Sequence, residues 1–289
     1  MYEKLEVCPA CRNTNFTNFL ICTDHLVSGE SFALNLCNKC GLVFTNPRPN
    51  EESIHKYYLS NKYLSHTNKS GNLLSLLYKL VRVYTIKKKI KLIQKYTENK
   101  TILDYGCGTG DFLQACKKVG FRTFGLEPNE NAKTQAQKKD LHLISNLKDL
   151  KERVDIITAW HVIEHVHDLK SVIRLLKKNL NNDGILFIAV PNMKSYDALY
   201  YKEHWAAYDV PRHLYHFTQE SFGKLIAKNK FKLIDTVPMI FDSFYISILS
   251  EKYMTGRNNY VKSIKTAYES NRKAKRNGEY SSITYILKK

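Results

Sequence analysis

The chain has 289 residues, a formal net charge of +18 and 43% hydrophobic residues. This length accommodates one large domain and a small one, and no apolar run is long enough for a membrane-spanning helix. The N-terminal segment lacks the basic start and apolar core of a secretory signal. We therefore expect a cytoplasmic protein whose seven cysteines stay reduced or bind metal.

The positive charge gathers in two stretches on either side of the centre, Lys87-Lys88-Lys89-Ile90-Lys91 and Arg272-Lys273-Ala274-Lys275-Arg276. Such stretches favour anionic partners, which include nucleic acid, phosphorylated sugars and an anionic membrane surface. The alternative is a lysine-rich surface that only contacts solvent. Composition leaves both interpretations open.

The first 48 residues contain two C-x-x-C pairs, Cys8-Pro9-Ala10-Cys11 and Cys37-Asn38-Lys39-Cys40. Four thiolates at this spacing suit one tetrahedral zinc ion, so Cys8, Cys11, Cys37 and Cys40 are the predicted ligands. A module this small has too little core to fold unaided, which indicates a structural zinc. We interpret residues 1–48 as a small β zinc ribbon that covers the active site. Its balanced charge argues weakly against a role in gripping phosphates.

Residues 49–99 are predicted to form a helical connector that packs on the main domain. Apolar residues recur there at steps of three and four, as in an amphipathic helix: Leu73, Leu76, Leu77, Leu80, Val81 and Tyr84.

From residue 100 onward, predicted strands and helices alternate. We expect strands at 101–104, 122–126, 141–144, 155–159, 185–190, 231–237 and 282–287, and helices at 111–119, 129–139, 169–179 and 221–229. This order predicts an α/β domain over residues 100–289, with a Rossmann-like, mostly parallel seven-stranded sheet and helices on both faces. Residues 241–278, approximately, form an insertion before the last strand.

A glycine-rich loop, Asp104-Tyr105-Gly106-Cys107-Gly108-Thr109-Gly110, joins the first of these strands to a helix. Glycines let the backbone approach a ligand closely, and a helix N-terminus offers free N–H groups. Glu127 ends the next strand, where an acid can accept both ribose hydroxyls of a nucleoside. The glycines do not have the G-x-G-x-x-G spacing of dinucleotide-binding enzymes.

This segment resembles class I S-adenosylmethionine-dependent methyltransferases, whose loop has the pattern Asp-x-Gly-x-Gly-x-Gly. The resemblance implies that Asp104 orients the amino acid part of the cofactor and that Glu127 binds the ribose. It also implies that Gly106, Gly108 and Gly110 approach the methionine and ribose, and that Asn146 meets the adenine. The remaining cofactor contacts that we expect are Cys107, Pro128, Trp160 and His161.

Two histidine-containing segments follow later strands, Trp160-His161-Val162-Ile163-Glu164-His165 and one around His213 and His216. The spacing of His161, Glu164 and His165 would place them on one face of a helical turn. One hypothesis makes His213 a general base, with His161 or His165 positioning the acceptor; these three are the candidate catalytic residues. The other, encouraged by similarity to small-RNA 2′-O-methyltransferases, is a divalent metal held by His161, Glu164, His165 and either His213 or His216. A third interpretation is that these histidines cap helices and pack.

The whole arrangement is similar to bacterial methyltransferases that carry an N-terminal zinc ribbon and to ubiquinone-O-methyltransferase-like enzymes. The resemblance implies transfer of a methyl group from S-adenosylmethionine to oxygen or carbon of a small or lipid-linked acceptor. Aromatic residues are candidates for the wall of the acceptor pocket: Tyr57, Tyr58, Trp205, Tyr208 and Tyr215. The alternative functions are an RNA-modifying methyltransferase, a nucleic-acid-binding protein that uses the basic stretches, or a scaffold without catalysis.

Overall fold

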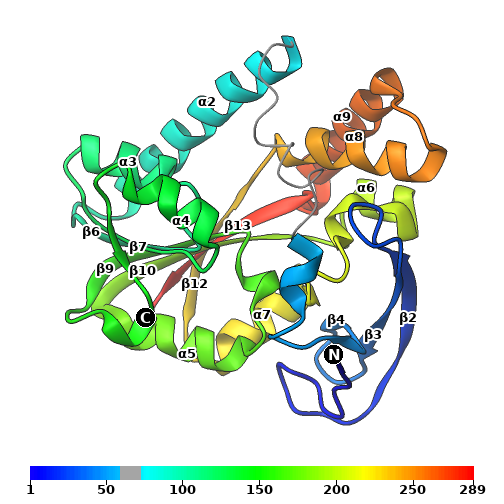
Figure 1. Cartoon of the computed structure of the whole chain (residues 1–289), viewed down its shortest axis with the longest axis horizontal. Coiled ribbons are helices and arrows are strands. Elements are labelled where there is room, and N and C mark those ends of the chain that lie inside the picture. The colour runs from blue at the N-terminus through cyan, green and yellow to red at the C-terminus, as the bar shows by residue number, and fades with distance from the viewer. Residues whose placement is uncertain (59–72) are drawn as a thin grey trace.

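A seven-stranded sheet forms the centre of the computed structural model (Figure 1). The structure describes the backbone of residues 1–58 and 73–289 and the side chains of residues 1–58 and 80–289. Its strands, in spatial order, are β8 (His142–Ile144), β7 (Arg122–Leu126), β6 (Thr101–Tyr105), β9 (Val154–Trp160), β10 (Leu180–Pro191), β13 (Ser282–Lys288) and β12 (Lys232–Pro238). The pairs among β6 to β10 are parallel, and β13 runs antiparallel to both of its neighbours. The predicted fold class is confirmed.

Helices cover both faces of this sheet because successive residues of the central strands point to opposite sides. On one side Leu103 packs with α5 (Leu169–Asn179) and α7 (Gln219–Lys228). On the other side Ile102 packs with α3 (Asp111–Lys118), whose neighbour is α4 (Glu130–Gln137). From β6 the chain adds β7 and β8 on one side of the sheet and then β9 and β10 on the other side. Open α/β sheets bind ligands where the strand order reverses in this way, and here that position lies between the carboxyl ends of β6 and β9.

The predicted connector contains η1 (Ile54–Tyr58) and α2 (Leu73–Tyr96), while residues 59–72 lie outside the described part. The packing residues differ from those that the apolar spacing suggested. Leu80 is 61% exposed and Tyr84 is 46% exposed, whereas Ile90 and Ile93 are buried against the sheet. The first half of α2 projects from the body of the molecule in Figure 1, so only the second half of the helix has a surface to cover.

The N-terminal module is built from two small sheets. In the first, β1 (Tyr2–Glu3) pairs with β5 (Arg48–Pro49). The second has the order β11-β4-β3-β2, formed by β2 (Phe16–Thr23), β3 (Ser31–Cys37), β4 (Val43–Thr45) and β11 (Tyr215–His216). Because β11 comes from the α/β domain, the second sheet is shared between the two regions of the chain.

A buried arginine fastens the module to the α/β domain. The guanidinium of Arg212 is 2.9 Å from an oxygen of Asp24, in the turn after β2, and 2.7 Å from an oxygen of Asp209. It also donates to the carbonyl of Tyr57 at 3.0 Å. Burial alone would raise the pKa of Asp24, but the hydrogen bond and charge of Arg212 outweigh it and lower that pKa. The pair is therefore ionised and fully enclosed.

Two helices, α8 (Asp242–Thr255) and α9 (Tyr260–Asn277), lie between β12 and β13, where the insertion was expected. They pack on each other and on α6 (Tyr196–Tyr201). The buried face of α9 consists of small residues that permit close approach: Ser263, Thr266, Ala267, Ser270 and Ala274. Short 3₁₀ turns complete the fold: η2 (Leu147–Asp149), η3 (Ile163–His165), η4 (Lys202–His204) and η5 (Ala206–Tyr208). Within the described residues, no helix has the length and apolar character needed to cross a membrane.

Candidate functional site

The glycine loop runs from the end of β6 to the start of α3, and its three glycines have φ values of 77°, 55° and 79°. A Cβ at Gly106 would lie 2.4 Å from Val162, and one at Gly110 would lie 2.5 Å from Leu141. Both positions therefore need glycine for conformation and for packing. A Cβ at Gly108 would meet nothing within 4 Å, so this part of the loop faces open space in which a ligand has room.

Glu127 lies directly against this loop, as the sequence predicted for an acid at the end of β7. One carboxylate oxygen accepts the N–H of Gly108 at 2.8 Å, and the other accepts the N–H of Asn129 at 2.8 Å. Pro128 is exposed beside it. The backbone thus fixes the carboxylate at the edge of the open space.

Cys107 and Asn146, two of the other predicted cofactor contacts, have side chains that pack in the core or cap a turn. Cys107 is buried, and its sulfur lies 2.9 Å from where a Cβ of Gly125 would be, so its side chain points into the core. Asn146 is exposed and caps η2 by accepting the N–H of Lys148 at 3.0 Å.

Asp104, the penultimate residue of β6, is buried, and its carboxylate accepts the hydroxyl of Thr158 at 2.6 Å. Burial raises the pKa of Asp104 to about 7, against the opposing effects of the Thr158 hydrogen bond and the charge of Lys89. Lys89 comes from α2, and the ring centroid of Trp160 lies 4.2 Å from its nitrogen. No signal in the sequence singles out Lys89, because nothing in a run of lysines shows which side chain points inward.

The segment after β9 does not form the helical turn that the spacing suggested. His161 has a left-handed φ of 57°, and the turn η3 begins only at Ile163. His161 nevertheless bridges two acids: its Nε2 is 2.9 Å from Asp242 of α8, and its Nδ1 is 3.3 Å from Glu164. Burial lowers the pKa of His161, but hydrogen bonds and charges from Asp242 and Glu164 outweigh it and raise that pKa to about 9.

His165 and His213 face each other, with ring centroids 4.5 Å apart. The Nδ1 of His165 is 3.0 Å from the carbonyl of Arg212, and the Nδ1 of His213 is 2.8 Å from the carbonyl of Ala207. A carbonyl only accepts, so each ring donates through Nδ1–H, and in its neutral form each ring has its lone pair on Nε2. Burial and the charge of His213 lower the pKa of His165 to about 4, which keeps that ring neutral.

Glu164 completes this cluster. Its carboxylate is fully buried, and neither oxygen has an aligned hydrogen-bond partner among the described residues. One ligand atom from each of Glu164, His165 and His213 lies within 4.8 Å of the others. His216 lies elsewhere, in β11, with its Nε2 3.2 Å from the hydroxyl of Thr45. The structure thus assembles Glu164, His165 and His213, with His161 bridging Glu164 to Asp242 and His216 outside the group.

Most of the aromatic residues expected around the acceptor are part of the core. Tyr57, Trp205, Tyr208 and Tyr215 are buried, and the indole of Trp205 donates to Asp197 at 2.8 Å. Tyr58 is the exception, since its hydroxyl is 3.1 Å from Nδ1 of His165. The sequence could not separate packing aromatics from pocket aromatics because both are apolar.

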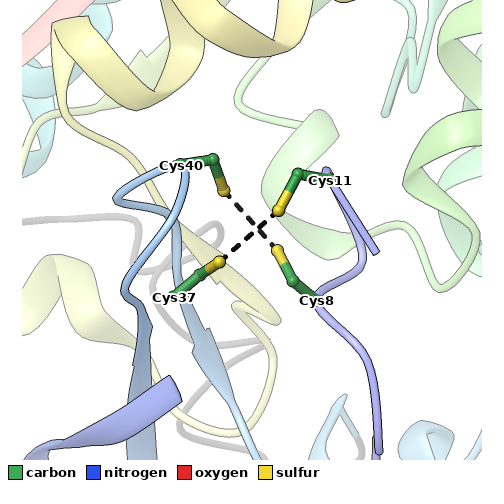
Figure 2. Close-up of side chains that lie close together, drawn as sticks. All are labelled: Cys8, Cys11, Cys37 and Cys40. Atoms are coloured by element: carbon green, nitrogen blue, oxygen red, sulfur yellow. Dashed lines mark hydrogen bonds between the residues drawn. The ribbon is translucent and has the colours of Figure 1, made fainter. Parts of the chain in front are cut away.

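The four cysteines of the two C-x-x-C pairs converge from opposite sides on one point (Figure 2). The sulfurs of Cys8 and Cys40 are 3.6 Å apart, and those of Cys11 and Cys37 are 3.5 Å apart. Tetrahedral bonds of about 2.3 Å to zinc require sulfur–sulfur distances of about 3.8 Å. All four sulfurs lie within 4.8 Å of one another, so the set fits one zinc ion.

The structure is an α/β fold with a glycine loop and open space beside Gly108 at the carboxyl ends of β6 and β7. Residues 79–236, more than half of the chain, match a family model described as a methyltransferase domain. The chain belongs to this methyltransferase family.

Similar proteins include the ubiquinone biosynthesis O-methyltransferase of Hydrogenovibrio crunogenus, 33% identical over 37% of this chain and 51% of that protein. The mitochondrial enzyme of the same name from Bos taurus is 32% identical over 32% of this chain and 28% of that protein. The first of these matches spans about half of the relative's length. Magnesium protoporphyrin IX methyltransferase from Synechocystis, solved with S-adenosylhomocysteine, shares the fold with a TM-score of 0.54 and 13% identity, over 82% of this chain and 99% of that one.

Proposed function

We propose that this enzyme methylates an oxygen or carbon atom of a small or lipid-linked acceptor beside His213. The observation that carries the proposal is the fixed tautomer of His213, whose Nδ1–H is held by the carbonyl of Ala207 at 2.8 Å. Its Nε2 lone pair is therefore available to take a proton from an acceptor hydroxyl or an acidic carbon. The O-methyltransferase names of the similar proteins support oxygen as the acceptor atom.

Residues of the chain around this base bind the cofactor and the acceptor. S-adenosylmethionine, when bound, supplies an electrophilic methyl group on a sulfonium sulfur. Glu127 accepts the ribose hydroxyls, and Gly108 leaves room for the nucleoside. His213 takes the acceptor proton as the acceptor atom bonds to the methyl carbon and the carbon–sulfur bond breaks. Alignment of the reacting atoms and exclusion of water contribute much of the acceleration.

His161 has a positioning role in this scheme. With its pKa raised to about 9, it is an imidazolium at neutral pH and has no lone pair with which to accept a proton. Its positive charge lies between Asp242 and Glu164, so it ties α8 to the turn that carries His165.

A divalent cation at Glu164, His165 and His213 is the second candidate for this cluster. The observation in its favour is the grouping of the buried Glu164 carboxylate with His165 and His213, whose ligand atoms all lie within 4.8 Å of one another. Two imidazoles and one carboxylate form a common ligand set for divalent transition metals, and Nδ1–H bonds to carbonyls are typical of histidine ligands. Restoration of activity by Mg²⁺ or Mn²⁺ after treatment with a chelator would favour this role over general base catalysis, whereas restoration by Zn²⁺ alone would point to the ribbon instead.

A structural zinc ion in the ribbon is the second part of the proposal, supported by the sulfur geometry. Lys228 from α7 donates to the carbonyls of Ala10 and Cys11 in the first knuckle, at 3.4 and 3.3 Å. A cation there also offsets the negative charge of a zinc ion bound to four thiolates.

An acceptor in or near a membrane is supported by the outer face of α9. Val261 is 81% exposed, Ile264 is 51% exposed and Tyr268 is 64% exposed. Residues 241–278 contain eight Lys or Arg residues and three Asp or Glu residues. An apolar stripe flanked by cations suits peripheral contact with an anionic lipid surface, whereas nucleic acid would need only the cations.

Transfer of a radioactive methyl group tests the proposal. The purified enzyme receives labelled S-adenosylmethionine with a lipid extract, a small-molecule extract or total RNA, and a His213→Gln variant serves as control. We expect label in the lipid or small-molecule fraction and a large loss in the variant. Label in RNA alone would support the RNA-modifying alternative, and equal label with the variant would refute the base role.

A further inference from the structure

A cavity of about 240 Å³ lies between the two cysteine knuckles of the ribbon and the helix α7. Its cationic wall consists of Lys39 from the second knuckle and of Lys224 and Lys228 from α7. Ala10 and Leu225 form an apolar part of the wall. Among the described residues that line this cavity, none belongs to the glycine loop or to the histidine cluster, so the cavity is separate from the candidate site described above.

Two further cations lie beside the cavity. Lys170 is the second residue of α5, and Arg12 directly follows the first knuckle. Burial and the positive charges of Lys228 and Arg12 lower the pKa of Lys170, so both side chains are close enough to repel its ammonium group. Like charges are held together in a fold at an electrostatic cost, and an anion placed among them would reduce that cost.

Most of these cations have no carboxylate partner. Lys224 forms an ion pair with Glu220 at 2.7 Å. Within the part of the chain that the structure describes, Lys39, Lys170 and Lys228 form no salt bridge with a carboxylate. The ammonium of Lys228 donates to two backbone carbonyls of the first knuckle, which hold it beside the cavity but do not neutralise its charge.

The zinc ion proposed for the ribbon offsets only part of this positive charge. Four thiolates around one Zn²⁺ have a net charge of about −2. The unpaired cations around them outnumber this charge: Arg12, Lys39, Lys170 and Lys228. Residues 1–48 alone are balanced in charge, so the surplus arises where α5 and α7 bring their lysines against the ribbon. A dianion matches this surplus.

We propose that the cavity binds a phosphate dianion, either free or as the monoester of a small molecule, with Lys39 and Lys228 donating to its oxygens. Lys170 and Arg12 strengthen the positive potential around it. Ala10 and Leu225 offer an apolar surface to the organic part of a monoester. A cavity favours one phosphate group over a nucleic-acid chain, which requires cations that follow its backbone.

Phosphorus NMR tests this site with the zinc-loaded full chain at pH 8, with inorganic phosphate and phenyl phosphate as separate probes. We expect saturable broadening of the phosphorus signal of at least one probe. For Lys39→Gln and for Lys170→Gln the affinity should fall about 2- to 5-fold, as for loss of one exposed charge contact. Tighter binding of phenyl phosphate would identify a monoester as the ligand, and equal binding of the two probes would identify free phosphate.

Three controls separate this site from other uses of the same lysines. Lys87→Gln removes an exposed lysine of α2 and should leave both affinities unchanged; an equal loss there would show that the anion senses only the net charge of the chain. The zinc content of Lys39→Gln and Lys170→Gln should stay at that of the natural chain, and loss of zinc from both would assign these lysines to the metal instead. Absence of saturable binding to the natural chain would overturn the proposal. So would an RNA oligonucleotide that binds more tightly than either probe and is weakened by the same two substitutions.

Discussion

Replacing Asp104 by asparagine should stabilise the folded chain at neutral and alkaline pH. Burial raises the pKa of Asp104 from 3.8 to about 7. The folded state therefore holds this proton more tightly than the unfolded state, and the free energy of unfolding falls as the pH rises between these two values. At 1.36 kcal/mol per pKa unit, the ionised carboxylate costs about 4 kcal/mol of stability above pH 7. Asparagine has nearly the same shape and can still accept the hydroxyl of Thr158.

Urea unfolding of the two proteins at several pH values, without cofactor, measures this cost. The stability of Asp104→Asn relative to the natural chain should rise by about 3 kcal/mol between pH 5 and pH 8. Affinity for S-adenosylhomocysteine should fall at the same time, because an amide cannot balance the α-ammonium. A difference in stability that stays flat or declines over this range would refute the argument that burial dominates at Asp104.

Asp155 lies near the start of β9 and serves as a control, because we expect the opposite dependence of stability on pH for its replacement. Burial raises its pKa, but hydrogen bonds from Thr101 and Asn181 outweigh this and lower the pKa below its ordinary value. A carboxyl group of this kind stabilises the fold above its unfolded pKa, and the contribution is lost as the pH falls through the folded pKa. Asp155→Asn should therefore be less stable than the natural chain at pH 7, with a deficit that shrinks in acid.

Three further predictions concern the ribbon and the base. Cys11→Ser should lower the zinc content, measured by mass spectrometry, from one ion per chain and reduce the melting temperature; a full zinc content would contradict the ligand assignment. Arg212→Met, which leaves Asp24 buried without its partner, should cost about 3–5 kcal/mol in chemical unfolding, and a cost below about 1 kcal/mol would show that the enclosed pair adds little. His213→Gln should reduce kcat about 10²- to 10⁴-fold while the affinity for S-adenosylhomocysteine stays unchanged, and equal losses of both would assign His213 to cofactor binding instead.

The sequence predicted the central fold well because its signals are local. The strand before Asp104, the glycines and Glu127 lie within one βαβ unit, and the structure joins Glu127 to Gly108 as their order suggested. The two cysteine pairs were equally informative, since four sulfurs on two tight turns have few alternative uses.

The contacts that the sequence could not predict all join residues far apart in the chain. His161 was expected on a helical face, but Asp242 of α8 bonds to it and the backbone adopts a left-handed conformation instead. Lys89 lies in a run of lysines, and its inward direction depends on where α2 lies on the sheet. Such contacts depend on the relative placement of whole elements, and periodicity within one element contains no information about it.

The pairing of β11 with β4 joins the ribbon to the segment that contains His213. The β11 residues Tyr215 and His216 pair with Phe44 and Val43, and only Leu214 separates them from His213. In the proposed scheme, loss of zinc would loosen β4, and the segment that contains His213 would lose its partner strand. Zinc binding and methyl transfer would then be thermodynamically linked although the zinc ion touches no reactant.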